Sequence, residues 1–148
     1  MYKIFGAPGA AAHISGNPAF PDLRGKALFY VRPTGVLMEF EVSGLPADSE
    51  TGFFALHIHA GEDCGGESFS DTGPHLNPTG TQHPLHAGDL PPLLSAGGRA
   101  YMAVLSNRFT LPEILEKTVV IHALPDDFRT QPAGGAGEKI GCGVIKKM

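Results

Sequence analysis

Five of the seven histidines of this chain lie between positions 57 and 89, and no other feature of the sequence is so chemically specific. The side chains in this stretch that could bind a cation are His57, His59, His75, His83, His86 and Asp89. Neutral imidazole is the side chain that ligates metals most often, and an added carboxylate suits zinc. The concentration of these residue types therefore indicates a metal site.

Two short motifs contribute most of these residues. His57 and His59 lie two apart in an apolar run, so on a strand both rings would face the same side. Two half-exposed histidines are the ordinary alternative. His83, His86 and Asp89 follow each other at intervals of three, and two nitrogens with one carboxylate oxygen suit tetrahedral zinc.

Three further histidines are less informative when taken singly. His75 lies in a Gly-Pro-His-Leu-Asn-Pro turn, and a lone loop histidine usually has no special role. His122 ends an apolar run, where a buried, hydrogen-bonded histidine is the ordinary interpretation. His13 stands among small residues and is expected on the surface.

The combination is stronger than its parts. Six histidines and one aspartate form two four-coordinate sites if one imidazolate bridges both metals; alternatively, one site keeps an open position. Nitrogen ligands favour copper or zinc, and the carboxylate favours zinc.

The composition is that of a globular chain. Its 148 residues, 42% hydrophobic and 18% charged, are enough for one domain with its own core, so residues 1–148 are expected to form a single domain. A net charge of −4 without a basic run argues against nucleic acid as a partner and against a polybasic membrane anchor. No apolar stretch reaches the length of a transmembrane helix.

The N-terminus and the cysteines bear on the compartment. The first residues, MYKIFGAPGAAAHIS, lack the basic start and long apolar core of a signal peptide. The chain as given is therefore expected in the cytoplasm, and export stays open if a signal was removed. The two cysteines, Cys64 and Cys142, permit one disulfide or two buried free thiols.

Short apolar runs between turns predict the elements that position the histidines. Residues 25–31 and 36–42 flank Pro33-Thr34-Gly35 and are typical of a hairpin, with Glu39 and Glu41 on a solvent-facing side. Further elements are expected as strands at 10–15, 53–59, 118–122 and 139–145, two short strands within 91–105, and one helical turn at 110–116 with Thr110 as N-cap. About eight short strands, with twenty glycines and thirteen prolines, predict an all-β fold of the Greek-key barrel or immunoglobulin-like sandwich type.

Two long segments, 60–90 and 123–138, have no sustained apolar period. Loops of this length are uncommon in a compact domain unless they are functional or disordered. Because the first of them carries most of the histidines, both are predicted to be functional loops, with metal ligation supplying the order that a packed core does not.

Several motifs occur in an order that resembles one known family. The motifs HIH, GPHLNP, HPLHAGDLPPL, VVIHALPDDF, QPAGGAG and CGVI are together similar to those of copper/zinc superoxide dismutase. The resemblance covers about residues 25–145. It implies an eight-stranded Greek-key β-barrel and an antioxidant oxidoreductase with copper and zinc as cofactors. The implied reaction turns its small-molecule substrate, superoxide, into dioxygen and hydrogen peroxide.

The resemblance also implies a role for individual residues. Copper would be held by His57, His59, His75 and His122, and zinc by His75, His83, His86 and Asp89. His75 would bridge the two metals and, with Lys139, act in catalysis. Asp126 would link a copper histidine to a zinc histidine, and Cys64 would form a disulfide with Cys142.

The chain departs from the family pattern at three places. Lys139 stands where the family usually has arginine, and lysine keeps the charge but loses the bidentate fork. The loop after His122 is short and has few charged residues, so attraction of the anion would rest on Lys139, with Arg129 as a second candidate. The AGED segment before Cys64 also differs slightly, which leaves the local loop geometry open.

Two other functions stay open at this level. A copper/zinc storage or delivery protein with little turnover would be compatible with Lys139 and the short second loop. A zinc-stabilised structural domain would not need the copper histidines at all. The complete ligand set favours the enzyme. A homodimer and a monomer are both compatible with the sequence.

Overall fold

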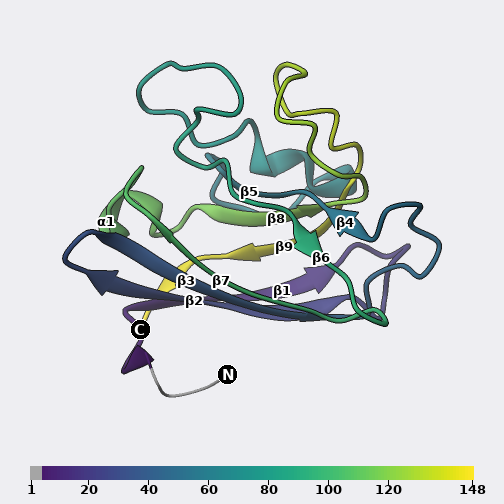
Figure 1. Ribbon diagram of the computed structural model, residues 1–148, viewed down its shortest axis with the longest axis horizontal. Helices are drawn as coiled ribbons and strands as arrows, with labels where there is room; N and C mark the ends of the chain where they lie inside the picture. Colours follow the sequence, from purple (N-terminus) through teal and green to yellow (C-terminus); the bar gives the residue numbers. More distant parts are fainter. Residues whose placement is uncertain (1–4) are drawn as a thin grey trace.

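The computed structural model describes residues 5–148, and its strands form a curled eight-stranded antiparallel sheet and a small two-stranded one (Figure 1). The elements in chain order are β1 Ala10–Gly16, β2 Arg24–Arg32, β3 Gly35–Ser43, β4 Phe53–Phe54, β5 Leu56–His59, the 3-10 helix η2 Glu67–Thr72, β6 Leu93–Leu94, β7 Ala100–Ser106, α1 Leu111–Ile114, β8 Thr118–His122, β9 Lys139–Val144 and β10 Lys146–Lys147. The main sheet has the order β5-β8-β9-β1-β2-β3-β7, with β10 beside β1. The predicted all-β Greek-key fold is confirmed.

The predicted hairpin is formed by β2 and β3, which pair from Arg24↔Ser43 to Arg32↔Gly35. The alternate residues of β3 that were expected inside, from Val36 to Val42, are buried in the core. Distant segments complete the sheet, because β9 pairs with β1 and β7 pairs with β3. This joining of the chain's ends explains why the strand order does not follow the sequence.

The structure refines two of the predicted strands. The run 53–59 divides at Ala55, because β4 pairs with β6 in the small sheet whereas β5 pairs with β8 in the large one. The two strands expected within 91–105 exist as β6 and β7, but each pairs with a different partner instead of with its neighbour. The expected helical turn is α1, capped by Thr110 and Glu113.

Strands β5 and β8 have two differently used faces. Leu56, Ile58, Val119 and Ile121 belong to the hydrophobic core inside the curled sheet. The histidines alternate with these apolar residues and therefore face the other way. They are buried because the long segments 60–90 and 123–138 pass over β5 and β8 on the same side of the sheet (Figure 1). Within residues 5–148 no helix could span a membrane.

The sequence pattern predicted Glu39 on a solvent-facing side. This prediction is wrong, because the residue is fully buried. Tyr30 donates a hydrogen bond to its Oε1 at 3.1 Å, and Tyr101 donates to its Oε2 at 2.6 Å. The ring of Phe5 packs on Tyr30 with centroids 5.6 Å apart. Strand alternation correctly placed Glu39 outside the barrel core, but large side chains on neighbouring strands cover it there.

We predict that Tyr30 ionises above the ordinary pKa of tyrosine. Burial raises its pKa, and the hydrogen bond and negative charge of Glu39 raise it further, against a smaller lowering by Arg32. Since the unfolded chain then loses this proton first, the free energy of unfolding should fall as the pH rises above the ordinary value, about 10. Ultraviolet titration and denaturant unfolding near pH 8 and near pH 11 measure both effects.

The control is Tyr30→Phe, whose titration is subtracted from that of the unaltered protein to isolate one phenol. The variant should also lose part of the alkaline destabilisation. A Tyr30 difference curve centred at or below the ordinary tyrosine value would contradict the prediction.

Candidate metal centre

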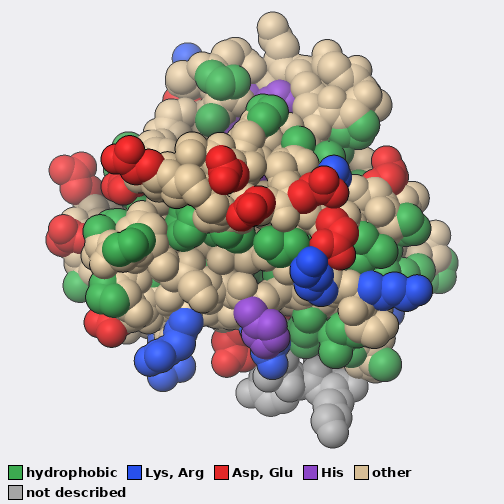
Figure 2. Space-filling view, turned by 180° about the vertical axis from the view of Figure 1, so that it is seen from behind, with side chains coloured by type: hydrophobic (Ala, Val, Ile, Leu, Met, Phe, Trp, Pro, Cys, Tyr) green, Lys and Arg blue, Asp and Glu red, His purple; other side chains and the backbone are tan. Residues whose placement is uncertain are grey.

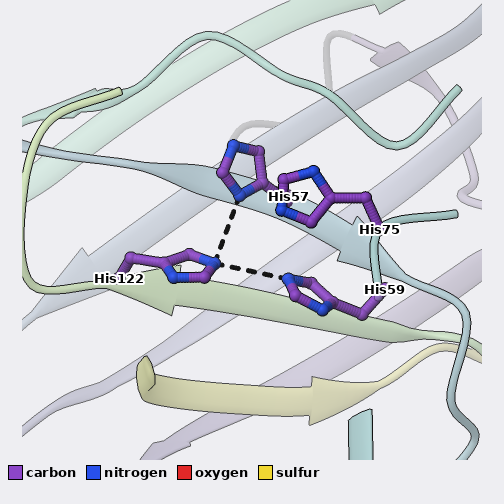
Figure 3. Close-up of side chains that lie close together, drawn as sticks. All are labelled: His57, His59, His75 and His122. Atoms are coloured by element: carbon purple, nitrogen blue, oxygen red, sulfur yellow. Dashed lines mark hydrogen bonds between the residues drawn. The ribbon is translucent and has the colours of Figure 1, made fainter. Parts of the chain in front are cut away.

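Four histidines meet on the loop-covered face of β5 and β8 (Figure 3). His57 and His59 come from β5, His122 ends β8, and His75 comes from the loop after β5. Nε2 of His122 lies 3.2 Å from Nδ1 of His57 and 3.3 Å from Nε2 of His59. Ligand atoms of all four lie within 4.8 Å of one another, and we call them the first group.

The remaining nitrogen of three of these rings donates to a fixed acceptor. His57 Nε2 lies 2.8 Å from Asp126 Oδ2, His59 Nδ1 lies 2.7 Å from the Gly73 carbonyl, and His122 Nδ1 lies 3.3 Å from the Gly137 carbonyl. A neutral imidazole has one N–H, so the nitrogens that face each other are all acceptors. Converging acceptors without a shared proton are the arrangement that a metal cation stabilises.

The electrostatics keep these rings neutral. Burial lowers the pKa of His59 to about 2 and that of His122 to about 3. Burial also lowers the pKa of His57, although the hydrogen bond that His57 donates to Asp126 opposes this effect. Neutral imidazole is the form that ligates metals, so His57, His59 and His122 are held in their binding state.

A second cluster adjoins the first around the carboxylate of Asp89. Its Oδ1 lies 2.7 Å from His75 Nδ1, and its Oδ2 lies 3.1 Å from Nδ1 of both His83 and His86. Burial opposes ionisation of Asp89, but the hydrogen bond and charge of His75 and its neighbouring histidines outweigh it, so the pKa is lowered.

The membership of this second cluster differs slightly from the sequence expectation. The residues with all ligand atoms within 4.8 Å are His57, His75, His83 and Asp89. His86 is not in that set, yet its Nδ1 lies 3.2 Å from His75 Nδ1 and 3.3 Å from Asp89 Oδ1. Because both nitrogens of His57 are already directed at Asp126 and His122, His86 is the better fourth ligand.

Two buried nitrogens test whether the residues fit two metal ions. Within residues 5–148, His75 Nε2 and His83 Nδ1 are the buried side-chain atoms without a hydrogen bond; His83 Nδ1 lies 3.1 Å from Asp89 Oδ2 but does not form a hydrogen bond with it. His75 belongs to both groups, and its Nδ1 already faces Asp89. Unpartnered buried polar atoms are unfavourable unless something satisfies them. One cation in each group would do so, and the donor set fits copper in the first and zinc in the second.

Asp126 connects the two groups. Its Oδ2 accepts from His57 Nε2 at 2.8 Å, and its Oδ1 accepts from His83 Nε2 at 2.7 Å. Burial would raise the pKa of this carboxyl, but the hydrogen bonds from the two histidines outweigh burial and lower it. Gly134 makes room for it: a Cβ there would lie 2.0 Å from Oδ1, and its φ of +71° suits glycine.

Lys139 and the cysteines lie beside the first group. Lys139 starts β9 opposite His122, and its Nζ donates to Thr72 Oγ1 at 2.7 Å and to the Gly73 carbonyl at 3.2 Å. Cys64 and Cys142 form a disulfide that joins the loop after β5 to β9. The other suggested cation, Arg129, is exposed and lies in the loop after His122.

Sequence reasoning missed residues that hold the ligands through the backbone. Gln131 accepts from His83 N at 2.9 Å and donates to His83 O at 2.7 Å. Arg108 donates to the carbonyls of Pro84 at 2.7 Å and His86 at 3.2 Å. No local motif could reveal these contacts, because each joins segments that are distant in sequence. His13, which was expected on the surface, is exposed.

Comparisons with known proteins agree on one family. The family model described as copper/zinc superoxide dismutase matches residues 23–145. The chain is 35% identical over 140 residues to superoxide dismutase [Cu-Zn] 2 of Aquifex aeolicus, covering 84% of this chain and 80% of that protein. It is 37% identical over 131 residues to superoxide dismutase [Cu-Zn] of Caulobacter vibrioides, covering 77% and 73%.

Solved structures show the same fold. The Cu/Zn superoxide dismutase from Brucella abortus aligns with a TM-score of 0.77 at 23% identity, over 93% of this chain and 99% of that chain. A SOD-like protein from Bacillus subtilis aligns with a TM-score of 0.78 at 23% identity, with the same coverage.

We predict that Asp126→Asn weakens metal binding in both groups. The amide removes the charge and one acceptor that orient His57 and His83, and losing such a partner lowers metal affinity roughly 10- to 100-fold. Competition with a chromophoric chelator measures the zinc and copper affinities. Glu138→Gln is the matched control, since it removes an exposed carboxylate nearby in sequence. Equal affinities in the two variants would refute the linking role.

Proposed function

This chain belongs to the copper/zinc superoxide dismutase family, and we propose that its own two ligand groups carry out that family's reaction. The protein is an oxidoreductase with copper and zinc as cofactors, and it disproportionates superoxide to dioxygen and hydrogen peroxide. We assign copper to His57, His59, His75 and His122, and zinc to His75, His83, His86 and Asp89.

One observation carries the assignment. His122 Nε2 lies within 3.3 Å of both His57 Nδ1 and His59 Nε2 with no proton to share, and His75, whose Nε2 has no hydrogen-bond partner among residues 5–148, belongs to the same group. All-nitrogen ligation favours copper, whereas the carboxylate of Asp89 favours zinc in the adjoining group. Strands β5 and β8 supply three of these ligands, so the copper site is built on rigid elements.

The chemistry divides between the copper ion and the side chains. Copper, held by the first group, would supply one-electron redox chemistry at this site. His75 would serve as the proton carrier at Nε2, the atom that lacks a hydrogen-bond partner among residues 5–148, in the state in which this nitrogen is not bound to copper. Its Nδ1 stays fixed beside Asp89 and His86, so the ring keeps its place while the proton at Nε2 is exchanged.

Lys139 attracts the substrate. The chain carries a net charge of −4, and acidic side chains are spread over the face seen in Figure 2, so an anion meets an unfavourable overall field. A local positive charge can outweigh a distant negative one. Lys139 is half-buried at the start of β9, and its charge acts on His59 and His122 of the copper group.

A storage or delivery role is not favoured by the site. Every proposed copper ligand is buried. Exchange proteins more often present accessible thiolates, whereas both cysteines of this chain are joined in a disulfide. The homodimer and the cytoplasmic location stay predictions from the sequence.

We predict that the protein loaded with both metals holds about one copper and one zinc and dismutates superoxide, and that His59→Ala abolishes activity while keeping zinc. His59 contacts the copper group alone, so removing it should spare the zinc ligands. Metal analysis and a superoxide assay are made on the same samples.

His13→Ala is the matched control, since it removes the exposed histidine outside both groups. Full loading with negligible activity in the unaltered protein would contradict the enzymatic proposal. Unchanged activity in His59→Ala would contradict the copper assignment.

We predict that Lys139→Met lowers kcat/KM roughly tenfold or more, because electrostatic steering accelerates association by such factors. The rate should also become less sensitive to ionic strength. Lys139→Arg should retain most of the rate, and Lys147→Met, which removes the same charge from the exposed strand β10, should have little effect. Stopped-flow assays over a series of salt concentrations measure this, and equal losses for both methionine variants would refute local attraction.

A further inference from the structure

Thr72 is a buried hydroxyl with a fixed orientation. It ends η2 and is 0% exposed. Its Oγ1 donates to the carbonyl of Phe69 at 2.8 Å, which uses the single hydrogen of the hydroxyl. The oxygen therefore acts as an acceptor toward Lys139 Nζ, which lies 2.7 Å away.

The same ammonium group is tied to a histidine of the copper group. Lys139 Nζ also donates to the Gly73 carbonyl at 3.2 Å, and that carbonyl accepts from His59 Nδ1 at 2.7 Å. An ammonium has three N–H donors. Two of them have acceptors among residues 5–148, which leaves the third to donate to an anion.

The loop that carries Thr72 contains a left-handed turn just before this residue. Ser68 and Phe69 have φ values of +49° and +60°, a left-handed backbone that non-glycine residues adopt only when their surroundings impose it. The Thr72 carbonyl accepts from Gly61 N at 2.7 Å, and the disulfide joins this loop to β9. The strained turn and these ties together direct the Phe69 carbonyl and the Thr72 hydroxyl.

We propose that Thr72 is a positioning residue, which holds the ammonium group of Lys139 beside the copper group so that its third N–H meets the incoming anion. The inference deepens the proposed function and rests on it. Lysine has a flexible stem and a point charge, whereas arginine reaches two acceptors with a rigid fork. Here the hydroxyl of Thr72 and the carbonyl of Gly73 give lysine two fixed acceptors, and one of the two depends on this side chain.

The test measures azide binding to the copper- and zinc-loaded protein by optical titration, a readout separate from turnover. Thr72→Val should weaken azide binding roughly three- to tenfold, which is the net effect of losing one typical hydrogen bond. Thr72→Ser keeps the hydroxyl and should bind azide as the unaltered protein does. Metal content and the copper electron paramagnetic resonance spectrum should be the same in all three proteins.

A double-mutant cycle separates positioning from general loosening of the loop. In a Lys139→Met background, Thr72→Val should change azide affinity by less than about twofold, because the two residues act through one contact. An undiminished effect in that background would overturn the proposal, as would unchanged azide binding in Thr72→Val itself. If the valine variant does not fold, Thr72→Ala is compared with Thr72→Ser by the same criteria.

The outcomes also distinguish this inference from the proposed function. A loaded protein that binds azide but fails to dismutate superoxide refutes the enzymatic proposal, and the dependence of azide binding on Thr72 is still measured. If the protein is active but Thr72→Val leaves its azide affinity unchanged, only the positioning role of Thr72 is refuted.

Discussion

The two metal groups depend on one buried carboxylate, that of Asp126. A carboxylate without solvent is unfavourable unless strong donors satisfy it, and His57, His83 and the Phe128 amide do so here. The same hydrogen bonds fix which nitrogen of each histidine is left to bind a metal. The two groups are therefore coupled through the protein itself. The carboxylate of Asp126 orients the ring of His57 in the first group and the ring of His83 in the second.

The barrel makes this polar cluster compatible with a stable fold. Strand alternation assigns Ile58 and Ile121 to the apolar core and their neighbours His57 and His122 to the opposite face. A polar face of this kind would ordinarily be exposed. The two long loops, 60–90 and 123–138, cover this face and are held in place by contacts with its histidines. The loops therefore shape the site, while the strands make it rigid.

Sequence reasoning succeeded where local periodicity governs the structure. The hairpin of β2 and β3, the capped turn at Thr110 and the pairing of His57 with His59 on one strand face all follow from short-range patterns. The joining of His75 to both groups, the Cys64–Cys142 pairing and the role of Asp126 came from the family resemblance, since no spacing rule brings such distant residues together. Glu39 was wrongly predicted to be exposed, because strand alternation indicates which face of the sheet a residue lies on but not whether other side chains cover that face.

The residues that sequence analysis missed share a physical reason. Gln131, Arg108 and Thr72 act on backbone groups or on another side chain's ammonium, and their partners lie on other segments. Such contacts depend on how the loops pack against the sheet. The types of the residues alone do not predict this packing. Lys139 lacks the rigid, two-pronged guanidinium of arginine. The hydroxyl of Thr72, on a strained turn, gives its ammonium group a second acceptor besides the Gly73 carbonyl. If Lys139 attracts the anion as proposed, loop geometry, rather than the ligand set, is the level at which the approach of the anion is adjusted.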